Sequence, residues 1–203
     1  MKLYEFEPFP NPRRVRMFFA EKGLDVERIQ INVPEGEHRQ PAFTNKNPTA
    51  TVPCLELEDG TVIGECSAIS SYIEATHPQP ALLGETATEK GVVHMWQARV
   101  ETGLFDAATT YFHHATPGLG ALEPFQNEAW GLKAKERVIK TMHLLDSALG
   151  SCEYIAGNSF SIADITALCG IDFAIYCNIH MPEECANLKR WHNTVSSRPS
   201  AAA

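Results

Sequence analysis

The sequence predicts two domains, a small α/β domain at the N-terminus followed by an all-α helical-bundle domain, in a chain of 203 residues. Signals for strands and helices alternate in the first third of the chain. Beyond about residue 88, apolar residues recur at steps of three and four, which is the spacing of packed helices. A proline-containing stretch between the two parts favours a linker. We therefore divide the chain into residues 1–77, a linker at 78–87 and helical residues 88–203.

The first domain is expected to begin with a strand, a helix and a second strand. Residues 2–6 alternate polar and apolar side chains and predict a short strand. Asn11 is expected to cap the helix that follows, with Pro12 in its first turn and Gly23 at its end. Apolar residues within 25–33 predict the second strand.

A hairpin and a helix complete this domain. Residues 51–57 and 61–64 predict two strands joined by a turn at Asp59-Gly60. Residues 66–76 carry apolar side chains at helical spacing. The resulting order, β-α-β-loop-β-β-α, resembles a thioredoxin-like unit.

Three long helices are expected in the second domain. Apolar positions between residues 93 and 111 predict the first, and those between 138 and 149 predict the second. A third helix is expected to begin at Ser161, with Asp164 reaching back to it as a capping box. The last residues, 199–203, are expected to be frayed.

Composition and charge restrict the possible partners. Hydrophobic residues make up 44% and charged residues 21%, which excludes a disordered or fibrous chain. A net charge of −8 argues against nucleic acid or an anionic membrane as a partner, since both require a basic face. The six cysteines show no metal-ligand spacing, and the pair His113-His114 lacks a third ligand, so no metal is expected. The cysteine pattern and the lack of an apolar signal stretch at the N-terminus predict a reduced, cytoplasmic protein. No apolar run approaches roughly 20 residues, so no membrane segment is expected.

Two segments carry a resemblance to a known family. Residues 47–53 read Asn-Pro-Thr-Ala-Thr-Val-Pro, and residues 65–69, after the predicted hairpin, read Glu-Cys-Ser-Ala-Ile. Together they resemble the glutathione-binding signature of the cytosolic glutathione transferase superfamily. A thioredoxin-like domain, a short linker and an all-helical domain are also the layout of that family. The resemblance implies the glutathione transferase fold, glutathione as co-substrate and a homodimer.

The same resemblance implies how glutathione is held. Its γ-glutamyl carboxylate would dock at Cys66 with Ser67 adjacent, because backbone N–H groups at a helix start favour an anion. Its ammonium group would lie near the carboxylate of Glu65. Cys66 replaces the usual Ser, and a thiol is a weak hydrogen-bond donor. Val52, before a cis Pro53, would pair its backbone with the cysteinyl part of glutathione. The alternatives are a plain helix start and a trans proline on an edge strand.

The glycyl end of glutathione would meet a separate segment. Residues 36–43 resemble the GEHKxPxF segment of plant phi-type members, whose His and basic neighbour hold the glycyl carboxylate. His38 and Arg39 match these by position, and Thr51 takes the place of a Gln that contacts glutathione there. The alternative is a solvated loop with ordinary charges.

The group that activates the sulfur departs from the common pattern. Phe9 stands where most members place Ser, in the first strand-to-helix turn. Pro10-Asn11 resembles the turn of bacterial Nu-type transferases, so the expected catalytic residue is Asn11, which would bind glutathione and donate its amide N–H to the thiolate. Alternatively, Asn11 is only a helix cap. The nearby basic side chains are expected on the solvated helix surface with no catalytic role; they are Arg13, Arg14 and Arg16.

The predicted function is a glutathione transferase that ionises glutathione for attack on a small hydrophobic electrophile. Two alternatives stay open. Glutathione-dependent reduction of disulfides is indicated by Asn11 and by the missing Ser, Tyr or Cys. A non-catalytic binding or regulatory protein with the same fold is indicated by Phe9 and Cys66.

Overall fold

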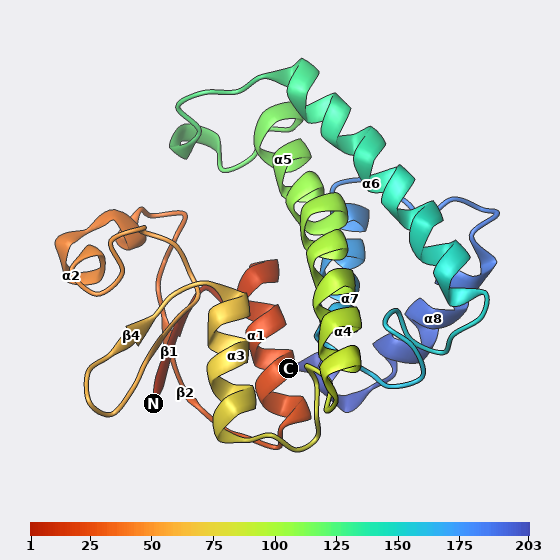
Figure 1. Cartoon of the computed structure of the whole chain (residues 1–203). Coiled ribbons are helices and arrows are strands. Elements are labelled where there is room, and N and C mark those ends of the chain that lie inside the picture. The colour runs from red at the N-terminus through yellow and green to blue at the C-terminus, as the bar shows by residue number, and fades with distance from the viewer. The chain divides into compact units, whose positions relative to one another are not determined.

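The computed structural model describes residues 1–203, and the chain divides into two compact units (Figure 1). The first unit comprises residues 1–80 together with 202–203, and the second comprises residues 81–201. The division therefore falls within the segment 78–87 expected as a linker. None of the helices combines the length and the apolar character needed to cross a bilayer.

A four-stranded sheet forms the centre of the first unit, with strand order β2-β1-β3-β4. Its strands are β1 Lys2–Glu5, β2 Glu27–Gln30, β3 Cys54–Glu56 and β4 Val62–Ile63. The central strand β1 runs parallel to β2 and antiparallel to β3, with Tyr4 opposite Ile29 on one side and Cys54 on the other. The predicted mixed order of strands and helices is confirmed, including the hairpin of β3 and β4.

Strand β2 is shorter than the predicted range of 25–33. Beyond its end, the amide of Ile31 still donates to the carbonyl of Glu5 at 2.7 Å, and Ile31 and Val33 are buried. Pro34 follows and has no N–H with which to extend the pairing. The apolar pattern of this segment therefore reflects burial of a loop as well as of a strand.

Four helical segments complete this unit: α1 Pro10–Glu21, η1 Glu37–Arg39, α2 Pro41–Thr44 and α3 Cys66–Thr76. The bounds of α3 are those predicted. The N-cap of α1 is Phe9, so the expectation that Asn11 caps this helix is wrong. Pro10 and Pro12 have no backbone N–H, so fewer unpaired N–H groups in the first turn need a capping side chain. The side chain of Asn11 bonds elsewhere, as described below.

The second unit is helical. It contains α4 Ala87–Val100, η2 Glu101–Phe105, α5 Asp106–Ala115, η3 Gly120–Leu122, α6 Glu128–Leu149, α7 Ile162–Tyr176 and α8 Ala186–Ser196. The last element, η4 Pro199–Ala202, crosses the boundary between the units after residue 201. The three predicted helices are present, and α8 is an additional one. The expected fraying of residues 199–203 is wrong, because residues 199–202 form a 3-10 turn in which Ser200 is buried.

A π-helical turn, η2, interrupts the first helix predicted for this unit. The carbonyl of Gly103 accepts a hydrogen bond from Thr141 Oγ1 of α6 at 2.9 Å. A Cβ atom on Gly103 would lie 2.6 Å from the same oxygen, so the close approach of α6 requires glycine here. A wider turn exposes a backbone carbonyl to a partner outside the helix, which accounts for the contact with Thr141.

The buried carboxylate of Asp164 holds the start of α7. It accepts hydrogen bonds from Ser161 N at 3.0 Å and Ser161 Oγ at 3.1 Å, from Ile155 N at 3.0 Å and from Trp191 Nε1 at 2.8 Å. The predicted capping relation between Ser161 and Asp164 is thus confirmed. Complete burial raises the pKa of Asp164 to about 6, although the donated hydrogen bonds favour its ionised form.

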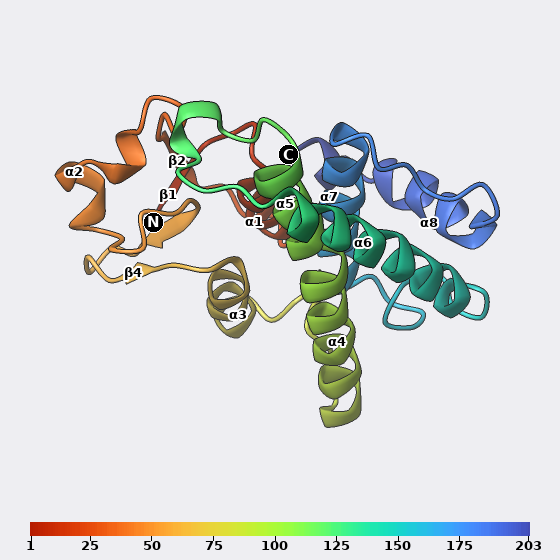
Figure 2. The same cartoon turned by 90° about the horizontal axis from the view of Figure 1, so that it is seen from above.

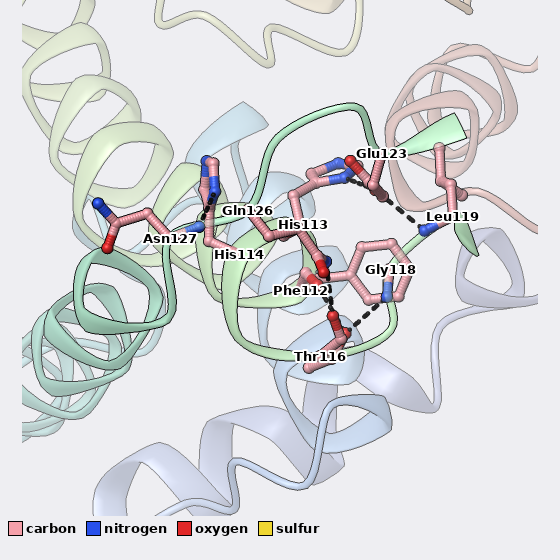
Figure 3. Close-up of polar contacts among 9 residues, drawn as sticks. All are labelled: Phe112, His113, His114, Thr116, Gly118, Leu119, Glu123, Gln126 and Asn127. Carbon is pink, nitrogen blue, oxygen red and sulfur yellow. Dashed lines mark hydrogen bonds and ion pairs between the residues drawn. The ribbon is translucent and has the colours of Figure 1, made fainter. Parts of the chain in front are cut away.

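The connection between α5 and α6 is held by side chains at the end of α5 (Figure 3). His113 Nδ1 pairs with Glu123 Oε1 at 2.6 Å, and His114 Nδ1 accepts from the amide of Asn127 at 3.2 Å. Gln126 Nε2 donates to the carbonyl of His113 at 2.8 Å. The two histidines therefore take part in loop closure, and no group of three or more His, Cys, Asp or Glu side chains in the structure is placed to hold a metal ion.

Candidate functional site

The candidate site lies in the first unit, where the starts of α1 and α3 meet. The thiol of Cys66 lies 3.4 Å from the carbonyl oxygen of Asn11 and 3.6 Å from Asn11 Oδ1, and it donates toward both. These residues are far apart in the sequence. The fold therefore brings together the predicted catalytic residue and the predicted carboxylate-binding residue.

Asn11 Oδ1 has a second partner, Arg14. The guanidinium donates from Nη1 to this oxygen at 3.0 Å, and Arg14 is only 5% exposed. Arg16 is also buried. The expectation that these two arginines lie on a solvated helix surface is therefore wrong, because each is buried and donates to an acceptor of the same unit.

Arg16 holds the loop that leads into α1. Its Nη1 pairs with Glu5 Oε2 at 2.6 Å, and its Nη2 donates to the carbonyl of Glu7 at 3.1 Å. Gln30 links the same groups, since its Nε2 donates to Glu5 Oε1 at 3.0 Å while its Oε1 accepts from Glu7 N at 2.9 Å. These bonds hold Glu5 and Glu7, just before the turn that contains Phe9. Sequence reasoning missed this network because its members come from β1, α1 and β2.

The turn before β3 offers an unpaired backbone. The peptide bond between Val52 and Pro53 is cis, as predicted. Neither the amide nor the carbonyl of Val52 has a hydrogen-bond partner within the chain. Asn47, which sequence reasoning did not single out, is buried and donates from Nδ2 to the carbonyl of Thr51 at 2.8 Å. It thereby fixes the turn in which Thr51 itself is exposed.

Helix α3 begins at an unusual backbone conformation. Its N-cap, Glu65, has φ 62° and ψ 127°, a left-handed value that residues other than glycine seldom adopt. The carbonyl of Glu65 accepts from Ile69 N at 3.0 Å. Glu65 and Ser67 expose their side chains, and Ser67 lies in the first turn, where amide groups have no partner within a helix. This arrangement can receive an anion and place a carboxylate beside it.

His38 and Arg39 lie on η1. His38 is 7% exposed, and its Nδ1 is buried without a hydrogen-bond partner. Burial, with a smaller effect of the Arg39 charge, lowers the pKa of His38, so the imidazole is neutral at pH 7. Arg39 is exposed. Figure 2 shows the adjoining α2 at one end of this unit and α3 at the other, and no hydrogen bond joins His38 to the remaining candidates.

Comparison with known proteins supplies the family. The family model "Glutathione S-transferase, N-terminal domain" matches residues 10–76, and "Glutathione S-transferase, C-terminal domain" matches residues 104–199. Glutathione S-transferase 2 of Saccharomyces cerevisiae is 46% identical over 203 residues, which cover 98% of this chain and 87% of the relative. The chain belongs to the glutathione S-transferase family.

Solved glutathione S-transferases share the fold over the whole chain. Gtt2 of Saccharomyces cerevisiae superposes with a TM-score of 0.96 at 45% identity, covering 100% of this chain and 99% of that one. A glutathione S-transferase domain-containing protein of Marinobacter aquaeolei VT8 also gives a TM-score of 0.96 at 45% identity, covering 98% and 99%. The protein is thus a glutathione-dependent transferase with the glutathione transferase fold, as its sequence predicted.

Proposed function

We propose that this glutathione S-transferase uses Asn11 to stabilise the thiolate of bound glutathione for attack on a small hydrophobic electrophile. One observation carries the proposal. In the first turn of α1, Pro10 and Pro12 have no N–H and Phe9 has no hydroxyl, so the side-chain amide of Asn11 is the neutral polar group of that turn.

A side-chain amide can supply most of the free energy needed to ionise the glutathione thiol at pH 7. A thiol with a pKa of about 8.5 is only a few per cent ionised at pH 7, and lowering its pKa by about two units takes roughly 2.7 kcal/mol. A hydrogen bond to a charged acceptor contributes about 1.5–3 kcal/mol. The dipole of α1 adds roughly 0.3–1 kcal/mol at its N-terminus. One amide and the helix start together therefore account for a mostly ionised thiol.

In this proposal, the γ-glutamyl, cysteinyl and glycyl parts of glutathione each contact a different set of residues. The γ-glutamyl carboxylate would meet the start of α3 at Cys66 and Ser67, with Glu65 near the ammonium group. Val52, before Pro53, would pair with the cysteinyl backbone through its own unpaired amide and carbonyl. Thr51, His38 and Arg39 would receive the glycyl end, which would give the buried His38 Nδ1 a partner. In this proposal residues 1–77 form the glutathione-binding domain, 78–87 the linker and 88–203 the helical domain.

Glutathione-dependent reduction of disulfides is the second candidate reaction, favoured by the Pro10-Asn11 turn. One glutathione thiolate would attack a disulfide sulfur, giving a mixed disulfide and releasing a thiolate. A second glutathione would displace the other half, leaving two thiols and oxidised glutathione. Equal rates of reduction of a small disulfide with and without the protein would exclude this reaction.

Relatives named as glutathione S-transferases favour an enzyme of either kind over a non-catalytic protein.

Ultraviolet titration of bound glutathione tests the role of Asn11. We expect the thiol to ionise about two pH units below 8.5 in the native protein and within about 0.7 units of 8.5 in Asn11→Ala, where the helix dipole still acts. Turnover with an electrophile should fall in this variant more than glutathione affinity does. Asn45→Ala, which alters an exposed asparagine of the same unit, is the matched control. Unchanged ionisation in Asn11→Ala, or no binding at millimolar glutathione, would contradict the proposal.

We also propose that the protein is a cytoplasmic homodimer. The homodimer is supported by the family resemblance, and the cytoplasm by six cysteines that are all unpaired in the structure, as in a reducing compartment. The mass in solution and cell fractionation test these two statements.

A further inference from the structure

We propose that Arg14 is a positioning residue for the glutathione thiolate and that it acts by orienting the side-chain amide of Asn11. The inference rests on the proposed role of Asn11 and adds the group that holds Asn11 in place. Arg14 lies one helical turn further along α1, is 5% exposed, and donates from Nη1 to Asn11 Oδ1 at 3.0 Å. The sequence predicted only solvated helix surface for this arginine.

The chemistry of the guanidinium decides which end of the amide faces it. Arginine has donors and no acceptor, so the atom of Asn11 that lies 3.0 Å from Nη1 is its oxygen. The Cys66 thiol, 3.6 Å from the same Oδ1, is a second donor on that side. With the oxygen directed at two donors, the NH₂ group of Asn11 is directed away from both.

Orientation matters because the two ends of an amide have opposite effects on a thiolate. The last torsion of an asparagine side chain is broad and roughly two-fold, so an unrestrained amide presents its oxygen about as readily as its nitrogen. An oxygen facing a thiolate repels it, whereas an N–H stabilises it. Arg14 therefore removes the unfavourable orientation before glutathione binds.

Arg14 also polarises the amide that it holds. A cation at Oδ1 draws electron density from the amide and strengthens its N–H groups as donors, and burial limits the screening of this charge by solvent. Arg16, the other buried arginine of α1, pairs with Glu5 at 2.6 Å. The two arginines thus have separate tasks, one in holding the loop before α1 and the other in holding Asn11.

A double-mutant cycle on the full-length protein tests this inference. The thiol pKa of bound glutathione is measured by ultraviolet titration in the native protein, Arg14→Met, Asn11→Ala and the double variant. We expect Arg14→Met to raise this pKa by about one unit when Asn11 is present and to change it little in the Asn11→Ala background. Arg13→Met, which removes the same charge from the neighbouring position, is the control and should leave the pKa within about 0.3 units of native.

Each outcome separates this inference from the proposed function. If Asn11→Ala raises the thiol pKa but Arg14→Met does not, the inference fails and the role of Asn11 stands. An equal rise from Arg14→Met in both backgrounds would show a direct charge effect and would also overturn the inference. If Asn11→Ala changes nothing, both fail together. Should Arg14→Met not fold, Arg14→Gln replaces it, since glutamine has both a donor and an acceptor and so does not select one end of the amide; a native pKa in that variant contradicts orientation by Arg14.

Discussion

At the scale of a single residue, His38 supports the proposal that the glycyl end of glutathione binds in the first unit. Its ring is buried, yet Nδ1 has no hydrogen-bond partner. Leaving a buried polar atom unpaired costs roughly 1–3 kcal/mol, so folding alone does not favour this arrangement. The lowered pKa follows from the same burial. A carboxylate arriving from solvent would both satisfy the ring and favour its protonation.

The pH dependence of ligand binding tests the role of His38. The free protein holds the pKa of His38 below its ordinary value of about 6.5, and a bound glycyl carboxylate would raise it. Binding then takes up a proton, so affinity must increase as pH falls. We expect roughly fivefold tighter binding of S-methylglutathione at pH 6 than at pH 8, measured by calorimetry. This ligand has no thiol to titrate, which isolates the histidine.

The His38→Gln variant is the control for that measurement. Glutamine keeps a donor and an acceptor but does not titrate in this range, so its affinity should be nearly constant between pH 6 and pH 8. A native protein without pH dependence, or a variant with the native slope, would remove His38 from the glycyl site.

At the scale of elements, the start of α7 depends on one carboxylate. Asp164 accepts four hydrogen bonds while fully buried, and they link α7 to residue 155 and to α8. In Asp164→Asn, an NH₂ group would face two donors and leave them unsatisfied. We expect a loss of about 2–4 kcal/mol in the free energy of unfolding, measured by urea denaturation.

Glu128→Gln is the matched control for that variant, since it removes one carboxylate charge from an exposed position at the start of α6. Its free energy of unfolding should stay within about 0.5 kcal/mol of the native value. A similar small change in Asp164→Asn would mean that the buried carboxylate does not hold α7.

Local patterns account for the elements that were predicted from the sequence. The Asp59-Gly60 turn, the helical spacing within 66–76 and the Ser161–Asp164 cap each specify structure through nearby residues. Helix α8 was missed although its buried residues Leu188, Trp191 and Val195 follow the helical spacing that a closer search would have found. The π turn at 101–105 had no local signal, because it depends on the approach of Thr141 from α6.

Across the whole molecule, the sequence predicted which residues belong to the candidate site better than it predicted the contacts that hold them. Resemblance singled out residues in four short segments, at 10–11, 36–43, 47–53 and 65–69, and their roles toward glutathione stay predictions. Arg14 and Arg16 were wrongly assigned to solvated surface and Asn47 was missed, because the partners of all three are set by the packing of α1 and of the turn before β3. The protein carries a net charge of −8, yet the first turn of α1 contains no acidic residue. This local absence of acidic residues at the start of α1 supports the proposal that an anionic sulfur is stabilised there.

A crystal structure of the protein with glutathione tests the central claim most directly. The account predicts Asn11 Nδ2 within about 3.5 Å of the glutathione sulfur, with Asn11 Oδ1 still bonded to Arg14. A sulfur beyond the reach of Asn11, with its hydrogen bond supplied by another residue, would contradict the account.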